Sequence, residues 1–137
     1  MSTPEVVENK ISSIQEHIRI LRKYTPHSLE EIKSDVTLRG AVERYLYLAA
    51  QSAIDLAEAM IALKRFRKPT TMGESFDILC DENTISRKTA NQMIKLAGFR
   101  NIIAHEYTKV NYDIVYDILQ NRLSDIEQFV REIQEKI

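Results

Sequence analysis

Apolar residues recur every three or four positions along most of the chain, and this spacing constrains the fold more than any other feature. The first such segment, residues 4–23, places its apolar side chains on one helical face: Val7, Ile11, Ile14, Ile18 and Leu21. Thr3 is a suitable N-cap for this helix, and Pro4 suits its first turn. The segment is therefore predicted to be an amphipathic helix with one buried face.

The same reasoning predicts helices along the rest of the chain. Ser28 and Glu31 have the spacing of a capping box and open a short helix. Asp35 is expected to cap a long helix that reaches about Phe66 and is apolar around most of its circumference, which is typical of a central helix. Three further helices are expected over residues 72–82, 87–108 and 112–136, the second of them interrupted or kinked at Gly98.

The expected fold is all-α. The sequence has no strand-like alternation, and three glycines and three prolines are few for a sheet protein with many tight turns. A length of 137 residues fits one domain with its own core. We predict a single helical domain over residues 1–137, an antiparallel bundle of four main helices plus short ones.

Several classes of protein are disfavoured by composition. The single cysteine, Cys80, can form neither an intrachain disulfide nor a thiolate zinc site. No stretch is expected to be apolar enough to span a membrane, and the N-terminus has no apolar signal region. A soluble cytoplasmic protein that does not bind membranes, and that has no metal site or cofactor, is therefore expected.

The charge is unevenly distributed although the net charge is only −1. Residues 64–109 contain nine Lys or Arg against five Asp or Glu, a net of +4, whereas residues 1–63 and 110–137 are acidic at −2 and −3. The basic segment supplies candidate RNA-binding residues of weak specificity: Lys64, Arg65, Arg67, Lys68 and Lys95. The alternative for residues 64–68 is that they close a helix C-terminus, where cations suit the helix dipole.

The stretch RNIIAHEY, residues 100–107, contains a polar set that a core helix does not need. Arg100 offers a planar cation that matches a phosphate, and His105 belongs to the residue type that exchanges protons near neutral pH. Asn101 and Tyr107 can orient a phosphate oxygen or a hydroxyl. Such a set without metal ligands suits RNA cleavage by the neighbouring 2′-hydroxyl, because the RNA supplies its own nucleophile.

The helical positions of these residues also allow the alternative that they are ordinary structural residues with no catalytic role. On an ideal helix Asn101 and His105 share a face, whereas Arg100 lies about 140° from His105, so only their long side chains could converge. Tyr107 lies about 200° from His105 and could reach the same cleft only where the helix frays or kinks. A lone histidine on a helix is more often an ordinary surface or core residue than a catalyst.

The stretch resembles the signature of the HEPN superfamily, in which an arginine, usually followed by a polar residue, precedes a histidine by four to six residues. The tyrosine two positions after the histidine resembles the HepT-like toxin branch. The runs ERYLYLAAQSAIDLAEAMIA and PTTMGESFDILCDENTISRKTANQMIKLAGFRNIIAHEY are similar to the central helix of that branch and to the segment that leads into its signature. The resemblance covers most of the chain.

The resemblance implies a metal-independent endoribonuclease, the toxin of a type VII-like toxin–antitoxin pair. It assigns catalysis to Arg100, Asn101 and His105, and assigns Tyr107 as the residue to which a minimal nucleotidyltransferase antitoxin adds AMP. It also implies a homodimer with the two motifs facing a shared cleft. The apolar circumference of the long helix, which is larger than one small bundle normally needs, favours such a dimer as well.

Two other functions stay open from the sequence. One is a non-catalytic HEPN module that binds a nucleotide or a nucleotidyltransferase partner through Arg100 and His105. The other is a structural bundle without a ligand.

Overall fold

The computed structural model describes residues 2–137, and every regular element among them is helical. The long elements are α1 (Pro4–Arg22), α3 (Val36–Lys64), α5 (Arg87–His105) and α7 (Leu123–Gln134). The shorter elements are α2 (Leu29–Ser34), α4 (Met72–Asp81), the 3₁₀ turn η1 (Tyr107–Lys109), α6 (Tyr112–Asp117) and the π-helical turn η2 (Ile118–Arg122). The all-α fold class is therefore confirmed.

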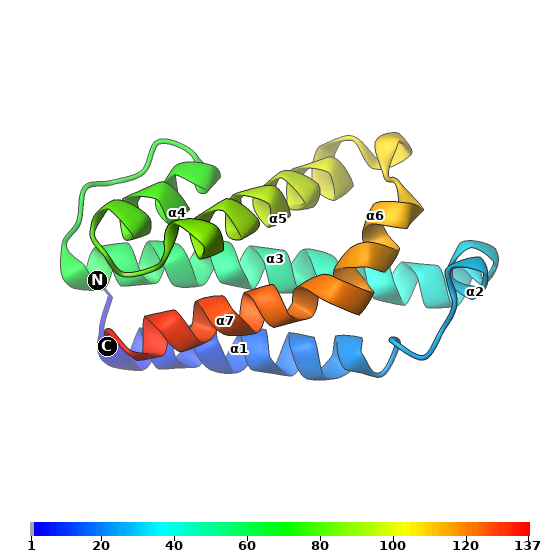
Figure 1. Ribbon diagram of the computed structural model, residues 1–137, viewed down its shortest axis with the longest axis horizontal. Coiled ribbons are helices and arrows are strands. Elements are labelled where there is room, and N and C mark those ends of the chain that lie inside the picture. Colours follow the sequence, from blue (N-terminus) through cyan, green and yellow to red (C-terminus); the bar gives the residue numbers. More distant parts are fainter. Residues whose placement is uncertain (1) are drawn as a thin grey trace.

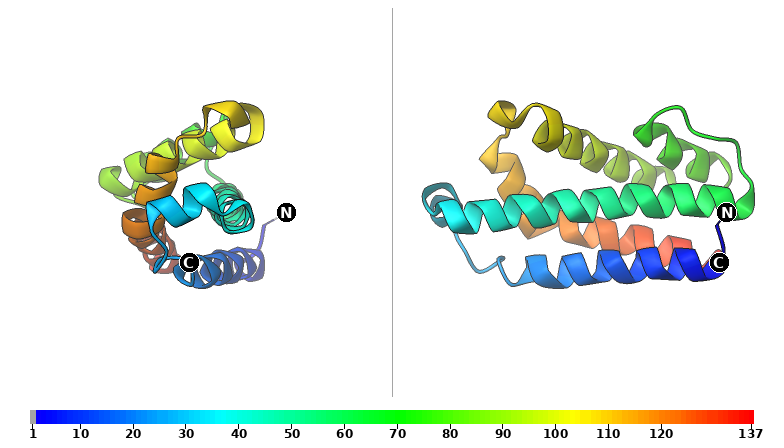
Figure 2. Two further views of the ribbon diagram at one scale, coloured as in Figure 1. Left: turned by 90° about the vertical axis from the view of Figure 1, so that its right-hand side faces the viewer. Right: turned by 180° about the vertical axis from the view of Figure 1, so that it is seen from behind.

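The four main helices run alternately back and forth along the molecule (Figure 1). α1 packs against α3, α3 against α5, α5 against α7, and α7 returns to α1, so the four form a closed bundle. Figure 2 shows this arrangement from one end and from behind, with α3 between α5 and α1. α4 covers the side formed by α3 and α5 at the end of the bundle that holds both chain termini.

Local sequence signals set where most of these helices begin. The Thr3 hydroxyl accepts a hydrogen bond from the amide of Val6 at 3.2 Å, as expected of an N-cap. Ser28 and Glu31 form the predicted capping box at the start of α2. The Asp35 carboxylate accepts from the amide of Leu38 at 3.0 Å and starts α3. These caps satisfy amide groups that would otherwise lack a partner.

The long helix α3 is the centre of the core. Its apolar residues contact four helices of the same chain, α1, α2, α4 and α5. This packing accounts for its apolar circumference without a second copy of the chain. The composition of α3 would by itself suit a membrane span, so the expectation that no stretch is apolar enough was wrong. Just over half of its most apolar stretch is nevertheless buried inside the bundle.

The C-terminal half differs from the sequence prediction in three details. α5 ends at His105 and not at residue 108, because Glu106 leaves helical geometry at φ −136° and ψ 47°. α5 continues through Gly98, so the expected interruption there was wrong. The predicted single last helix is divided by η2, a π-helical turn of the kind that inserts an extra residue into a helix.

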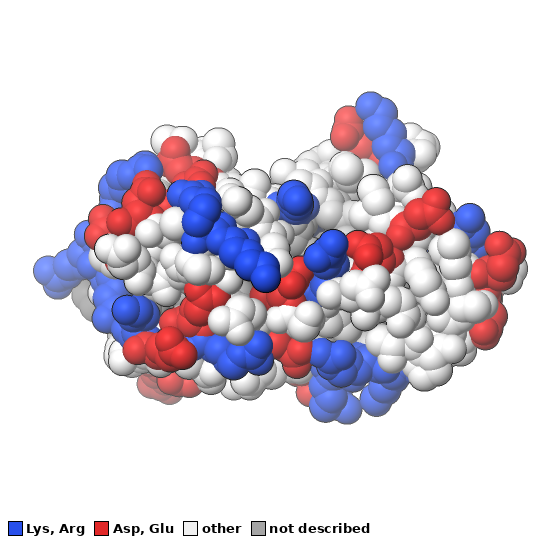
Figure 3. Space-filling model, viewed as in Figure 1, with Lys and Arg blue, Asp and Glu red and all other residues white. Residues whose placement is uncertain are grey.

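Charged side chains of both signs are interspersed over the face formed by α4, α5 and α7, without one large basic patch (Figure 3). The mixed charges on this face agree with the net charge of −1.

Candidate functional site

A groove of about 540 Å³ lies between the first half of α3 and the last turns of α5. Both elements contribute four residues to its walls: Gly40, Glu43, Arg44 and Tyr47 from α3, and Arg100, Ile103, Ala104 and His105 from α5. The structure thus brings Arg100 and His105, five residues apart, to one groove, although they do not share one face of an ideal helix.

The Arg100 side chain is fixed by three hydrogen bonds. Nε donates to Gln51 Oε1 at 2.8 Å, one terminal nitrogen donates to the Tyr47 hydroxyl at 3.2 Å, and the other donates to Asn101 Oδ1 at 3.0 Å. A guanidinium has five N–H groups, so two stay available to a ligand. Because the planar fork is already oriented, little rotamer entropy would be lost when it binds a phosphate.

Tyr47 brings a second cation to the same place. The guanidinium carbons of Arg100 and Arg44 lie 5.2 Å and 5.8 Å from the centroid of the Tyr47 ring, within the range of cation–π attraction. Arg44 is exposed, and its side chain lines the groove. The groove therefore has two guanidinium groups around one aromatic ring, an arrangement suited to an anionic ligand.

His105 is the last residue of α5 and is exposed to solvent. The helix closes with the amide of Glu106 donating to the carbonyl of Ile102 at 2.9 Å, after which the chain turns away. His105 thus presents its imidazole at the mouth of the groove, where a substrate can reach it. Histidine is the residue type that most often acts as a general acid or base.

Tyr107 begins the turn η1 directly after this helix end. The residue is 53% exposed, yet its hydroxyl donates a hydrogen bond to Glu43 Oε2 at 2.6 Å. Tyr112 donates to the other oxygen, Oε1, at 2.8 Å. Glu43 is only 6% exposed and lines the groove, so its bond to Tyr107 holds that residue beside the groove. Tyr107 reaches this position because α5 has ended at His105, as its angle of about 200° from His105 on a continuous helix requires.

These contacts alter the acidity of both tyrosines. The hydrogen bond to the Glu43 carboxylate, with a smaller effect of burial, raises the pKa of the Tyr107 hydroxyl. For Tyr112 the order is reversed: burial, followed by the hydrogen bond to Glu43, raises its pKa. Both phenols therefore stay protonated at neutral pH.

The other residues predicted from sequence lie elsewhere. Asn101 is exposed but does not line the groove, and its side chain instead holds Arg100. Lys64 closes α3 seventeen residues after Tyr47, about 25 Å along the helix axis at 1.5 Å per residue. Arg65, Arg67 and Lys68 follow it at that same end, where Arg67 pairs with Glu74 at 3.3 Å.

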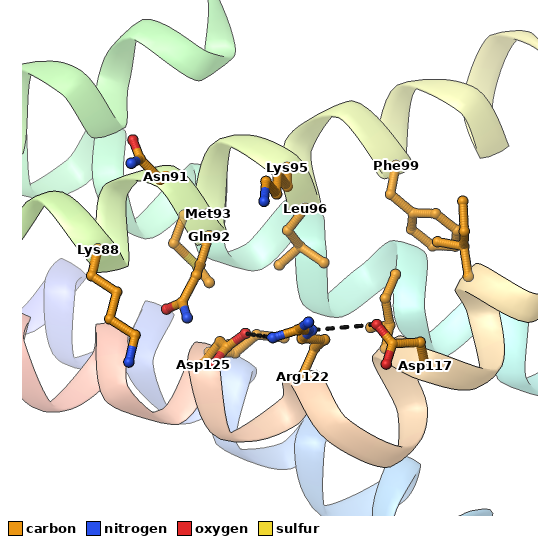
Figure 4. A pocket seen from close by; sticks show the side chains of 13 residues that line it. Lys88, Asn91, Gln92, Met93, Lys95, Leu96, Phe99, Asp117, Arg122 and Asp125 are labelled. Carbon is orange, nitrogen blue, oxygen red and sulfur yellow. Dashed lines mark hydrogen bonds and ion pairs between the residues drawn. The ribbon is translucent and has the colours of Figure 1, made fainter.

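Lys95 lines a second pocket, of about 430 Å³, between α5 and the α6–α7 segment (Figure 4). Arg122 reaches across its wall to Asp117 at 3.3 Å and to Asp125 at 3.8 Å. Apolar side chains such as Leu96 and Phe99 form the rest of the lining. Arg122 is thus paired with acidic side chains, and the arginine–histidine pair belongs to the other groove.

Sequence reasoning missed the residues of α3 that complete the site. Glu43, Tyr47 and Gln51 are polar positions four residues apart on a mostly apolar helix, with Arg44 beside them. This polar stripe was the available signal, because a central helix has no need of it. Tyr112 carried no comparable signal.

Within residues 2–137, no group of three or more His, Cys, Asp or Glu side chains is placed so as to hold a metal ion. The groove itself combines two guanidinium groups with an exposed imidazole.

The all-helical bundle and the arginine and histidine that converge on its groove agree with the HEPN resemblance of the sequence. The model of the ribonuclease HepT-like family matches residues 14–133, and the chain belongs to this family. The family thus places the chain among ribonucleases.

Relatives and solved structures agree with this assignment. The mRNA nuclease HepT of Shewanella oneidensis is 32% identical over 131 residues, which cover 95% of this chain and 97% of the relative. The tRNA nuclease HepT of Aphanizomenon flos-aquae is 26% identical over 130 residues, which cover 95% of this chain and 88% of the relative. The tri-AMPylated Shewanella oneidensis HEPN toxin, solved in complex with an MNT antitoxin, superposes with a TM-score of 0.89 at 28% identity, covering 97% of this chain and 99% of that one.

Proposed function

We propose that the groove cleaves RNA without a metal ion, by attack of the ribose 2′-hydroxyl on the adjacent phosphate. The observation that carries this proposal is the convergence of a pre-oriented Arg100 and an exposed His105 on one groove. His105 accepts the proton of the 2′-hydroxyl, and the 2′-oxygen then attacks phosphorus. Arg100 stabilises the negative charge that develops on the phosphate oxygens. The 5′-oxygen leaves, which gives a 2′,3′-cyclic phosphate and a 5′-hydroxyl end.

Expulsion of the 5′-oxygen needs a proton, and each groove contains one histidine. We propose that the protein acts as a homodimer in which two grooves share a cleft, so that the second His105 can supply this proton. The family resemblance supports the dimer, whereas the composition of α3 no longer does. Light scattering at micromolar protein should give about twice the 15.9 kDa mass of the chain.

We further propose that the protein is a cytoplasmic toxin controlled by a nucleotidyltransferase antitoxin that attaches AMP to Tyr107. Support comes from the modified toxin of Shewanella oneidensis and from the position of Tyr107, exposed and next to the groove. An attached nucleotide would place a phosphate near Arg100 and fill the space that RNA requires.

The direct test is incubation of the purified, unmodified protein with total RNA in the presence of chelator, alongside His105→Ala. Cleavage by the wild-type protein alone supports the proposal. RNA binding without cleavage would instead favour the non-catalytic module.

A further inference from the structure

Glu43 joins two tyrosines that are far from it in sequence. Its carboxylate oxygens accept from the hydroxyls of Tyr107 and Tyr112, which lie 64 and 69 residues further along the chain. Arg39 Nε lies 3.9 Å from Oε1, and its guanidinium lies 5.6 Å from the centroid of the Tyr112 ring. A carboxylate that is 94% buried needs such partners, because burial of an uncompensated charge is costly.

Among the described residues, the bond from Tyr107 to Glu43 is the one side-chain hydrogen bond that joins η1 to α3. None of the three residues of η1 is buried, so apolar packing does little to hold this turn. The aromatic ring faces solvent, while the hydroxyl oxygen is engaged by the buried carboxylate. Tyr107 therefore looks accessible as a residue, although its reactive atom is held inward.

This arrangement conflicts with modification of the same oxygen. A phenol that attacks a nucleoside triphosphate must bring its oxygen to the α-phosphorus, and the Glu43 charge would repel the incoming phosphate. After modification the oxygen has no proton to donate, and the new phosphodiester would place a second negative charge beside Glu43. The bond to Glu43 and the modified tyrosine are thus mutually exclusive.

We infer that Glu43 is a positioning residue that latches the acceptor tyrosine inward in the unmodified protein and must release it before nucleotide transfer. The inference rests on the proposed modification of Tyr107. In that step the released phenolic oxygen bonds to the α-phosphorus of ATP and the bond to pyrophosphate breaks. Pyrophosphate leaves, and the phenolic proton passes to a base of the transferase. Glu43 thereby limits how fast Tyr107 is modified.

The test compares Glu43→Gln with Tyr112→Phe. Glu43→Gln keeps the shape but replaces a charged acceptor with a neutral one, which weakens the bond to Tyr107. Tyr112→Phe removes the competing donor and leaves the Tyr107 bond in place. Each unmodified protein is incubated with the nucleotidyltransferase and ATP, and AMP addition to Tyr107 is followed by intact mass and peptide mapping.

We expect Glu43→Gln to accelerate the first addition about five-fold, from the difference between charged and neutral hydrogen bonds. Tyr112→Phe should give no acceleration. An equal acceleration in both variants would mean that any loss of a hydrogen bond around Glu43 speeds AMP addition by destabilising the fold, which would contradict the inference. A wild-type or slower rate of AMP addition in Glu43→Gln would also overturn it. If Glu43→Gln does not fold, Glu43→Asp, whose shorter side chain withdraws the carboxylate, takes its place with the same expectation.

A second measurement does not depend on the transferase. Acetylation of tyrosine hydroxyls by N-acetylimidazole, quantified by peptide mass spectrometry, should be faster at Tyr107 in Glu43→Gln than in wild type, with Tyr24 as the internal reference. An unchanged rate at Tyr107 would contradict the latch. Absence of AMP addition in every variant would refute the proposed modification, while the acetylation rates would still decide whether Glu43 holds Tyr107.

Discussion

One terminal nitrogen of the Arg100 guanidinium donates to the Tyr47 hydroxyl at 3.2 Å, and the same guanidinium lies 5.2 Å from the centroid of the Tyr47 ring. Tyr47 thus orients Arg100 by a hydrogen bond and attracts it by its π-system. Both contacts come from the central helix α3, which packs against α1, α2, α4 and α5. The cation of the proposed active site is therefore held by the core of the protein.

Removal of the Tyr47 hydroxyl should slow RNA cleavage without unfolding the protein. Tyr47→Phe keeps the ring but loses the hydrogen bond, and we expect about a three- to ten-fold fall in kcat with little change in KM, since an oriented cation matters most in the transition state. Tyr45→Phe, on the same helix beside His17, is the matched control and should cleave like wild type. A fall in both variants would point to a general defect of α3.

Arg44 should bind RNA more strongly than the basic cluster at the far end of α3. In a His105→Ala background that prevents turnover, Arg44→Ala should weaken RNA binding and reduce the salt dependence of log K by about 0.7, the value for one phosphate contact to a single strand. Lys64→Ala should reduce the salt dependence of log K less, because Lys64 lies about 25 Å along the helix from Tyr47. Equal changes would show that the bound RNA extends to residues 64–68.

Gly40 and Gly98 form a matched pair that separates stability from access to the groove. Both are exposed residues within helices, and a Cβ added at either would meet no atom within 4 Å. Each change to alanine should raise the free energy of unfolding by about 0.5–1 kcal/mol. Only Gly40→Ala should also slow cleavage, because only Gly40 lines the groove. If both variants keep wild-type activity, RNA does not approach that part of α3 closely.

The sequence predicted the individual helices better than it predicted the contacts among them. Apolar periodicity and the caps Thr3, Ser28 and Asp35 were sufficient for the first three helices, because these signals are local. The end of α5 was placed three residues too late because Glu106 and its neighbours contain no glycine or proline to stop a helix. The π turn at Ile118–Arg122 leaves the 3.6-residue apolar pattern almost intact, so it gave no signal.

The candidate site was predicted only in part, for a related reason. Arg100 and His105 were found because they are close in sequence and chemically unusual in a helix. The Glu43–Tyr107 pair depends on a contact across 64 residues that no local pattern records. The same holds for Gln51, which orients Arg100 from 49 residues away.

Tyr107→Phe should separate modification from cleavage. Co-expression with the nucleotidyltransferase should add about 329 Da, or multiples of it, to the wild-type protein. Tyr107→Phe should gain no mass and should keep much of its RNA cleavage, because the tyrosine hydroxyl contacts Glu43 and not Arg100. The same mass gain in Tyr107→Phe would place the acceptor at another residue.

Whether Arg100 and His105 cleave RNA without metal can be decided from the chemistry of the RNA ends formed in the presence of chelator. Purified unmodified protein is incubated with a defined RNA and with the same RNA carrying a 2′-deoxy substitution at the cut site, alongside His105→Ala and Arg100→Lys. We expect 2′,3′-cyclic phosphate and 5′-hydroxyl ends from the unsubstituted RNA alone. Activity should fall about 10²–10⁴-fold in His105→Ala with unchanged helicity, and Arg100→Lys should be poorly active. Cleavage of the 2′-deoxy RNA, a requirement for magnesium, or full activity in His105→Ala would refute this mechanism.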